Sequence, residues 1–148
     1  MARIYRAMTA ESGKPAVGQS ARKLGIRPGT DIDVHPSGNV LPGNNGMSVA
    51  PYWWSLEAHR IPKRFLGREY VDETGTARML DFAAGSNNDE LFRMGSGSFA
   101  EGPLTAELSL VVDVPGKHGV VSPARIMTLT MYEASLAATR DQWEIEPL

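Results

Sequence analysis

Arg6 and Ser48 are the two residues whose side chains and sequence setting best suit a ligand that carries anionic and sugar groups. Arg6 lies between Ile4 and Met8 in a segment of alternating hydrophobicity, so it is expected on an apolar face. A charge on such a face needs a partner, either an acidic side chain of the protein or a phosphate or carboxylate of a ligand. Ser48 follows the flexible run 43–46, and its hydroxyl either binds a sugar or is satisfied at a strand edge.

A glycine- and proline-rich stretch, residues 28–64, holds further candidates. Long irregular segments within a compact domain are usually functional or disordered, and the neighbouring aromatic residues here argue against disorder. Trp53 and Trp54 can stack on a planar ring, or one can join the core while the other packs under a loop. His59 and Arg60 can bind anionic groups or be ordinary exposed loop residues.

Two more titratable residues fall on expected strands. His118 begins a strand, where an imidazole can bind a ligand or transfer a proton, or can simply bond to the backbone. Glu107 is the acid of a strongly alternating segment and is either catalytic or solvated. The histidines, which are His35, His59 and His118, lie far apart and the chain has no cysteine, so no metal site is expected.

The bulk composition is that of one globular domain spanning residues 1–148, with a formal net charge of −2. Such a net charge argues against a nucleic-acid partner that is attracted by the electrostatic field of the whole domain. A local attraction stays open, because four basic residues form either a basic patch or a solvated turn: Arg60, Lys63, Arg64 and Arg68. No apolar run reaches the ~20 residues of a membrane span. The N-terminus lacks an apolar signal core, so we expect a cytoplasmic protein without a cleaved leader, and export by machinery that needs no such signal stays open.

Strands outnumber helices among the expected elements. Strands are expected at 3–8, 31–35, 47–50, 91–94, 104–114 and 118–122, and a hairpin over 69–80 turns at Thr74-Gly75. Short helical turns are expected at 20–24 and 55–59, and a loop at 85–89. A C-terminal helix follows the spacing of Leu129, Tyr132, Leu136 and Trp143, capped by Thr128 or Thr130. This order favours an α+β fold with a mainly antiparallel sheet.

Several segments together resemble the ADP-ribosyltransferase-like toxin domains of bacteria, best known among type VI secretion effectors. The segments are Ile4-Tyr5-Arg6-Ala7, Gly46-Met47-Ser48-Val49, His59-Arg60-Ile61-Pro62, the segment 118–129 (His-Gly-Val-Val-Ser-Pro-Ala-Arg-Ile-Met-Thr-Leu) and the segment 136–143 (Leu-Ala-Ala-Thr-Arg-Asp-Gln-Trp). The closing pattern is the strongest match, and residues 67–102 match nothing in the family.

The resemblance implies a strongly bent, split β-sheet around a cleft that receives NAD, whose ADP-ribose is transferred or hydrolysed. It implies catalytic roles for Arg6, Ser48 and His118, with Trp53, Trp54, His59 and Arg60 joining Arg6 and Ser48 in binding NAD. It also implies an immunity protein or antitoxin as partner and a macromolecular target. In this family a glutamate late in the chain normally supports the oxocarbenium-like transition state. The expected place for it, 118–121, has no glutamate in this sequence. The alternative is therefore a non-enzymatic toxin or binding module on the same fold.

Overall fold

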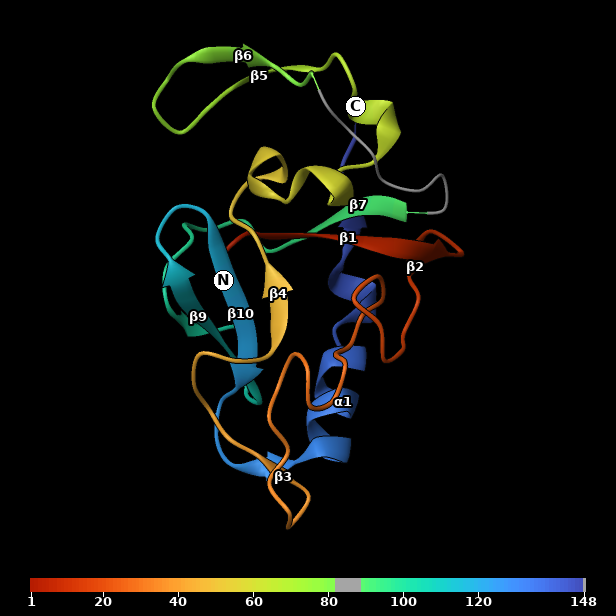
Figure 1. Cartoon of the computed structure of the whole chain (residues 1–148), viewed down its shortest axis with the longest axis vertical. Coiled ribbons are helices and arrows are strands. Elements are labelled where there is room, and N and C mark those ends of the chain that lie inside the picture. The colour runs from red at the N-terminus through yellow and green to blue at the C-terminus, as the bar shows by residue number, and fades with distance from the viewer. Residues whose placement is uncertain (82–88, 148) are drawn as a thin grey trace.

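Two four-stranded antiparallel sheets form the framework of the protein (Figure 1). The computed structural model describes residues 1–81 and 89–147. In the first sheet the long strand β1 (Ile4–Glu11) pairs with β7 (Asp89–Met94) on one side and with β2 (Lys14–Pro15) on the other. Strand β12 (Glu144–Ile145) covers the outer edge of β7.

The second sheet has the order β4-β10-β9-β8 and meets the first at a single bridge. Its strands are β4 (Met47–Val49), β10 (His118–Pro123), β9 (Leu108–Val114) and β8 (Gly102–Pro103). Just after β4, the Tyr5 and Ala50 backbones exchange two hydrogen bonds, with N···O distances of 2.8 and 3.0 Å. This bridge places Ser48 of β4 beside Arg6 of β1.

The C-terminal helix packs beside the second sheet. Strand β11 (Met127–Thr128) pairs with β3 (Asn39–Val40) and leads into α1 (Leu129–Ala137). Thr128 caps the helix, because its hydroxyl accepts a hydrogen bond from the Met131 N–H. A 3₁₀ turn, η4 (Arg140–Gln142), follows, and Tyr132, Leu136 and Trp143 are fully buried.

The 53–80 segment covers the other face of β1 and β7. Its elements are the 3₁₀ turns η1 (Trp53–Ser55), η2 (Ala58–Arg60) and η3 (Lys63–Phe65), and the hairpin of β5 (Glu69–Val71) and β6 (Ala77–Met79). The hairpin projects from one end of the molecule (Figure 1). A second apolar cluster, made by Tyr5, Trp53, Ile61, Phe65, Leu80 and Leu91, lies under the turns.

Strand β1 is therefore buried on both faces. Tyr5 enters the second cluster, while Ile4 and Met8 enter the main core with α1 and the second sheet. Arg6 has the same strand parity as Ile4 and Met8, and only 6% of its surface is exposed. The sequence prediction that Arg6 shares their face is confirmed.

The expected α+β architecture with antiparallel sheets and a C-terminal helix is confirmed. Strands β1, β4, β7 and β10 and the β5–β6 hairpin fall where the alternation predicted them. The single helical turn expected at 55–59 is replaced by two 3₁₀ turns, which overlap the two ends of that segment. The loop expected at 85–89 lies outside the described residues, apart from Asp89, which begins β7.

Three local predictions were wrong. Residues 20–24 form no helix, because their carbonyl groups turn toward the Arg6 side chain instead of toward later amides. Residues 31–35 form no strand; Asp31 instead pairs with Arg27, and its carbonyl accepts the Gly46 N–H. Strand β9 starts at Leu108, four residues late, because Thr105 closes a turn by accepting the backbone N–H groups of residues 107 and 108.

Candidate functional site

A cavity of about 540 Å³ opens where β1, β4, the 20–31 loop, the 3₁₀ turns and the β9–β10 turn meet. This volume is in the range of small-molecule sites. Its lining holds four cationic side chains against two carboxylates. The lining side chains that can form polar contacts are Arg6, Arg27, Asp31, Ser48, Ser55, Glu57, Arg60, Lys117 and His118.

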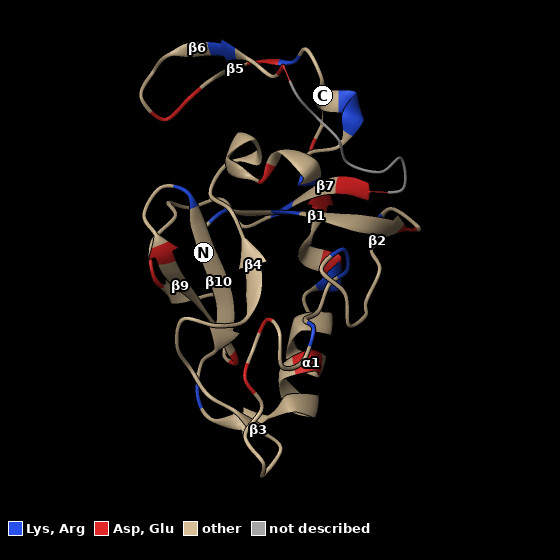
Figure 2. Cartoon of the chain, in the orientation of Figure 1, with Lys and Arg blue, Asp and Glu red and all other residues tan. Residues whose placement is uncertain are grey.

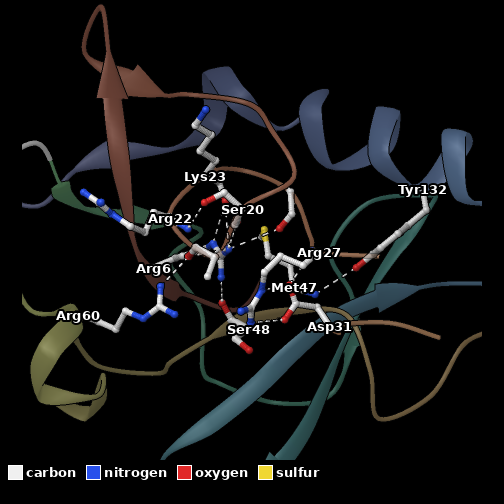
Figure 3. Close-up of polar contacts among 12 residues, drawn as sticks. Arg6, Ser20, Arg22, Lys23, Arg27, Asp31, Met47, Ser48, Arg60 and Tyr132 are labelled. Atoms are coloured by element: carbon white, nitrogen blue, oxygen red, sulfur yellow. Dashed lines mark hydrogen bonds and ion pairs between the residues drawn. The ribbon is translucent and has the colours of Figure 1, made fainter. Parts of the chain in front are cut away.

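Arg6 forms the floor of this cavity and is surrounded by five backbone carbonyl groups (Figure 3). Its guanidinium donates to the Ser48 carbonyl at 2.8 Å and to the Lys23 carbonyl at 3.0 Å. The Ala21 carbonyl lies at 3.2 Å, and those of Ser20 and Gly25 lie at 3.5 Å. We call these groups the carbonyl cluster; they hold the 20–25 loop and β4 against β1.

The Arg6 charge has no acidic partner among the residues that the structure describes. Burial, and then the nearby charge of Arg60, lowers the pKa of Arg6 to about 10, so it is still cationic at neutral pH. Within residues 1–81 and 89–147, no carboxylate forms an ion pair with Arg6 or Arg60. A buried cation held by neutral carbonyls leaves a positive field in the cavity.

Arg60 also lines a second, neighbouring cavity of about 450 Å³. Arg60 Nη1 donates to the Ala21 carbonyl at 2.8 Å, and Arg60, Ala21 and Arg27 line both cavities. His59, which contacts Glu57 at 3.3 Å, lines the second. The structure thus brings the predicted residues Arg6, Ser48, Arg60 and His118 to the first cavity, and His59 with Arg60 to the second.

Arg27 and Asp31 form a fixed pair at the rim. Asp31 accepts from the Arg27 backbone N–H at 2.7 Å and from the guanidinium at 3.1 and 2.8 Å. Burial raises the pKa of the Asp31 carboxyl, but the side-chain and backbone hydrogen bonds from Arg27 outweigh it, so the net pKa lies below its ordinary value. Sequence reasoning missed this pair, whose i,i+4 spacing around Pro28-Gly29 was its one signal.

Ser48 lies at the centre of β4, with its side chain exposed between buried Met47 and Val49. Its carbonyl is used by Arg6, while its hydroxyl lines the cavity and forms no hydrogen bond to any residue that the structure describes. The start of β4 is anchored by Tyr132. The Tyr132 hydroxyl donates to the Val121 carbonyl at 2.5 Å and accepts the Met47 N–H at 3.2 Å.

Gly46 must be glycine for β4 to enter this position. Its φ is 138°, and an added Cβ would collide with the Val121 carbonyl and lie 2.7 Å from the Tyr132 hydroxyl. The glycine therefore permits the close approach of β4 to β10, and this approach determines the position of Ser48 in the cavity.

The two tryptophans lie outside the linings of both cavities. Trp54 stacks with both Tyr52 and Tyr70, with ring centroids 4.8 and 4.9 Å away. Trp53 is buried against Phe65 at 5.1 Å. Their rings build the second apolar cluster and the base of the hairpin, and stacking on a ligand would require them to leave this stack.

The remaining predicted residues are held by intramolecular contacts. Arg64 pairs with Glu90 at 2.8 Å, and Arg68 donates to the Pro147 carbonyl at 2.8 Å. Glu107 sits in the turn before β9 and pairs with Arg125. Figure 2 shows acidic and basic segments next to one another on the β5–β6 hairpin, as the Asp72–Arg78 pair requires.

The structure gives no support for a metal centre or a membrane span. Among the described residues, no group of three or more His, Asp or Glu side chains is arranged to hold a metal ion. In the same ranges, the helices are too short or too polar to cross a bilayer. No family model, curated protein or solved structure matches the chain.

Proposed function

We propose that the domain binds NAD across the two neighbouring cavities and cleaves its nicotinamide–ribose bond, as a toxin of the ADP-ribosyltransferase-like kind. The observation that carries the proposal is the pair of guanidiniums, Arg6 and Arg60, that face one cavity without carboxylate partners in the described ranges. An anionic ligand would supply the missing charge. Arginine is well suited to bind phosphate because its donors are planar and permanently charged.

Each residue has a distinct place in this proposal. Arg60 lines both cavities, so the pyrophosphate of a ligand that spans them would pass beside it. The Ser48 hydroxyl would bind the nicotinamide ribose. Arg6 is already engaged with the carbonyl cluster, so it would orient β4 and the 20–25 loop and contribute charge at a distance. The junction of the two sheets at Tyr5 and Ala50 supports the bent, split sheet that the sequence resemblance implies.

Two carboxylates reach the cavity although the late glutamate of the family is absent. Glu57 is largely exposed at the rim, and Asp31 is held by Arg27. Positive charge develops on the ribose as the nicotinamide leaves, and a carboxylate close to that ring would stabilise it. Glu57, whose contact in the described structure is with His59, can move toward a ligand more easily than Asp31 can.

Binding of NAD is the first test. Calorimetry should show binding by the wild-type domain, and a loss of affinity of about tenfold or more in Arg60→Ala and Ser48→Ala, since each removes a direct ligand contact. Arg125→Ala, whose partner Glu107 lies outside both cavities, is the matched control. A folded wild-type domain that binds no NAD at millimolar concentration would refute the proposal.

A non-enzymatic binding module is the second candidate, and the projecting hairpin favours it. Leu66, Val71 and Met79 are more than half exposed at that end of the molecule. Growth arrest on expression in a bacterium separates the two. Toxicity that survives Ser48→Ala and Arg60→Ala, but not polar substitutions of Val71 and Met79, would favour the binding module.

A further inference from the structure

The turn between β9 and β10 contains a β-bulge that redirects Asp113. Val112 pairs with Gly119 and Val114 pairs with His118, so Asp113 is the extra residue of the bulge. A bulge bends its strand and changes the direction of its side chains, and bulges are common next to active sites. Here the redirected carboxylate meets the side chain of His118, the first residue of the returning strand.

Asp113 and His118 form a short, directed contact. Asp113 Oδ1 lies 2.6 Å from His118 Nδ1 and also accepts the Val114 backbone N–H at 3.0 Å. An ionised carboxylate can only accept hydrogen bonds, so Nδ1 must carry the proton. In the neutral imidazole the lone pair then lies on Nε2.

The His118 ring also lines the candidate site. Its side chain is 38% exposed, and Val114, Lys117 and His118 together form one wall of the first cavity. Within the described part of the chain, Nε2 has no hydrogen-bond partner. The aspartate thus fixes the tautomer on one side of the ring, while the basic nitrogen has no described partner and belongs to a partly exposed ring that lines the cavity.

We propose that His118 is a general base, oriented by Asp113, that activates water for the hydrolysis of NAD. This inference rests on the proposed function and specifies its reaction as glycohydrolysis. The water oxygen bonds to C1′ of the nicotinamide ribose and gives a proton to His118 Nε2. The C1′–N bond breaks, its electron pair goes to the ring nitrogen, and neutral nicotinamide leaves. The proton then passes from Nε2 to solvent, so no further co-reactant is required.

His118 is the catalytic residue of this pair and Asp113 is a positioning residue. A base of this kind accelerates a reaction by typically 10²–10⁴-fold. The carboxylate contributes by holding the Nδ1–H tautomer, as the buried aspartate does in serine protease triads. The pair resembles that arrangement in geometry only, with water taking the place of a serine.

The first experiment is nitrogen NMR of the His118 ring in the protein without ligand. The wild type should show a protonated Nδ1 and an unprotonated Nε2 in the neutral ring. Asp113→Asn should lose this tautomer preference, and Asp113→Glu should restore it in part. A wild-type ring with its proton on Nε2 would overturn the proposal whether or not NAD binds.

The second experiment measures nicotinamide release and NAD affinity on the same samples. His118→Gln should lower kcat by about a hundredfold or more. Asp113→Asn should lower kcat by about tenfold or more. Neither should change the Kd for NAD appreciably, because neither group contacts the ligand before water attacks. Asp33→Asn and His35→Gln, exposed and outside both cavities, are matched controls.

The proposed NAD site and the proposed general base would be refuted by different results. If NAD binds but wild type and His118→Gln release nicotinamide from it at the same rate, His118 is not the general base, and the proposed binding site is unaffected by that result. NAD that does not bind would overturn both. Cleavage that yields ADP-ribose bound to a protein, without free ADP-ribose, would also overturn water as the nucleophile.

Discussion

The floor and the rim of the main cavity use their polar groups in opposite ways. On the floor, the Arg6 guanidinium is buried and donates to the carbonyl cluster, so its hydrogen-bonding capacity is directed into the fold. On the rim, Asp113 engages one nitrogen of His118, a residue that lines the cavity, and leaves the other without a hydrogen-bond partner in the described structure.

The difference separates two kinds of candidate residue that look alike in a sequence. A charged side chain on an apolar strand face suggested a ligand-binding role for Arg6, yet the contacts show that it also holds three chain segments together. Substitutions on the floor should therefore act first on stability. Substitutions of the Asp113–His118 pair on the rim should act on chemistry with little effect on folding.

Arg6→Met should give the largest loss of stability. The variant keeps the apolar stem but removes the Arg6 donors from the carbonyl cluster, in which the Ala21 carbonyl keeps the hydrogen bond from Arg60. Each buried acceptor left unpaired costs about 1–3 kcal/mol. The free energy of unfolding in urea should fall by about 3 kcal/mol or more. Arg6→Lys should recover little, because an ammonium lacks the planar fork that reaches both the 20–25 loop and β4.

Tyr132→Phe should cost less, although it also loosens β4, the strand that carries Ser48. It removes the hydroxyl that bridges the Val121 carbonyl and the Met47 N–H, and we expect a loss of about 2 kcal/mol in urea unfolding. Burial raises the pKa of Tyr132 well above its ordinary value, so its hydroxyl stays protonated across the stable range. A loss below that of exposed Arg125→Ala would contradict the assigned role of the bridge.

His118→Gln should change the free energy of unfolding by less than about 0.5 kcal/mol, since the side chain is partly exposed and packs at a turn. The same variant should lose catalysis, as proposed above. The contrast with Arg6→Met is the sharpest test of the distinction between floor and rim. If His118→Gln lowers the free energy of unfolding as much as Arg6→Met does, the distinction between floor and rim is wrong.

The β5–β6 hairpin offers a local, pH-dependent test remote from the cavity. Hydrogen bonds from Arg78, and then from Thr74, hold the pKa of the Asp72 carboxyl well below its ordinary value. The stabilisation is therefore complete above the ordinary aspartate pKa of about 4 and is lost as pH falls through the lower folded value. Amide exchange at Thr74 and Thr76, measured along an acid series and corrected for intrinsic rates, should show protection falling at the acid end.

Asp72→Asn should remove this pH dependence while leaving the NAD affinity of the domain unchanged. The hairpin lies outside the linings of both cavities, so a change in affinity would show that it communicates with them. Unaltered amide protection in Asp72→Asn would contradict the role of the carboxylate in closing the turn.

Much of the fold could be predicted because its long strands alternate and its turns carry glycine or proline. Strand β1, strand β10 and the hairpin are examples. The failures were at 20–24 and 31–35, where the backbone is shaped by a side chain from another part of the chain. Arg6 and Arg27 determine those loops through contacts that local propensity does not contain.

Only part of the candidate site could be predicted, because tertiary contacts also determine which side chains reach it. Ser48 and His118 could be identified by residue type and by position at a strand. Asp113 could not, because within an alternating strand it reads as an outward-facing residue until the bulge shifts the register. Trp53 and Trp54 drew attention as aromatic neighbours, but tertiary packing with Tyr52 and Tyr70 accounts for both.

The carbonyl cluster also has a consequence for the order in which the protein assembles. Its members lie from 14 to 42 positions beyond Arg6, so all of them are synthesised after it. Until β4 has been synthesised and has met β1, the guanidinium keeps its water. Its dehydration therefore belongs to a late step of folding, and the cavity floor closes only after the two sheets have found each other.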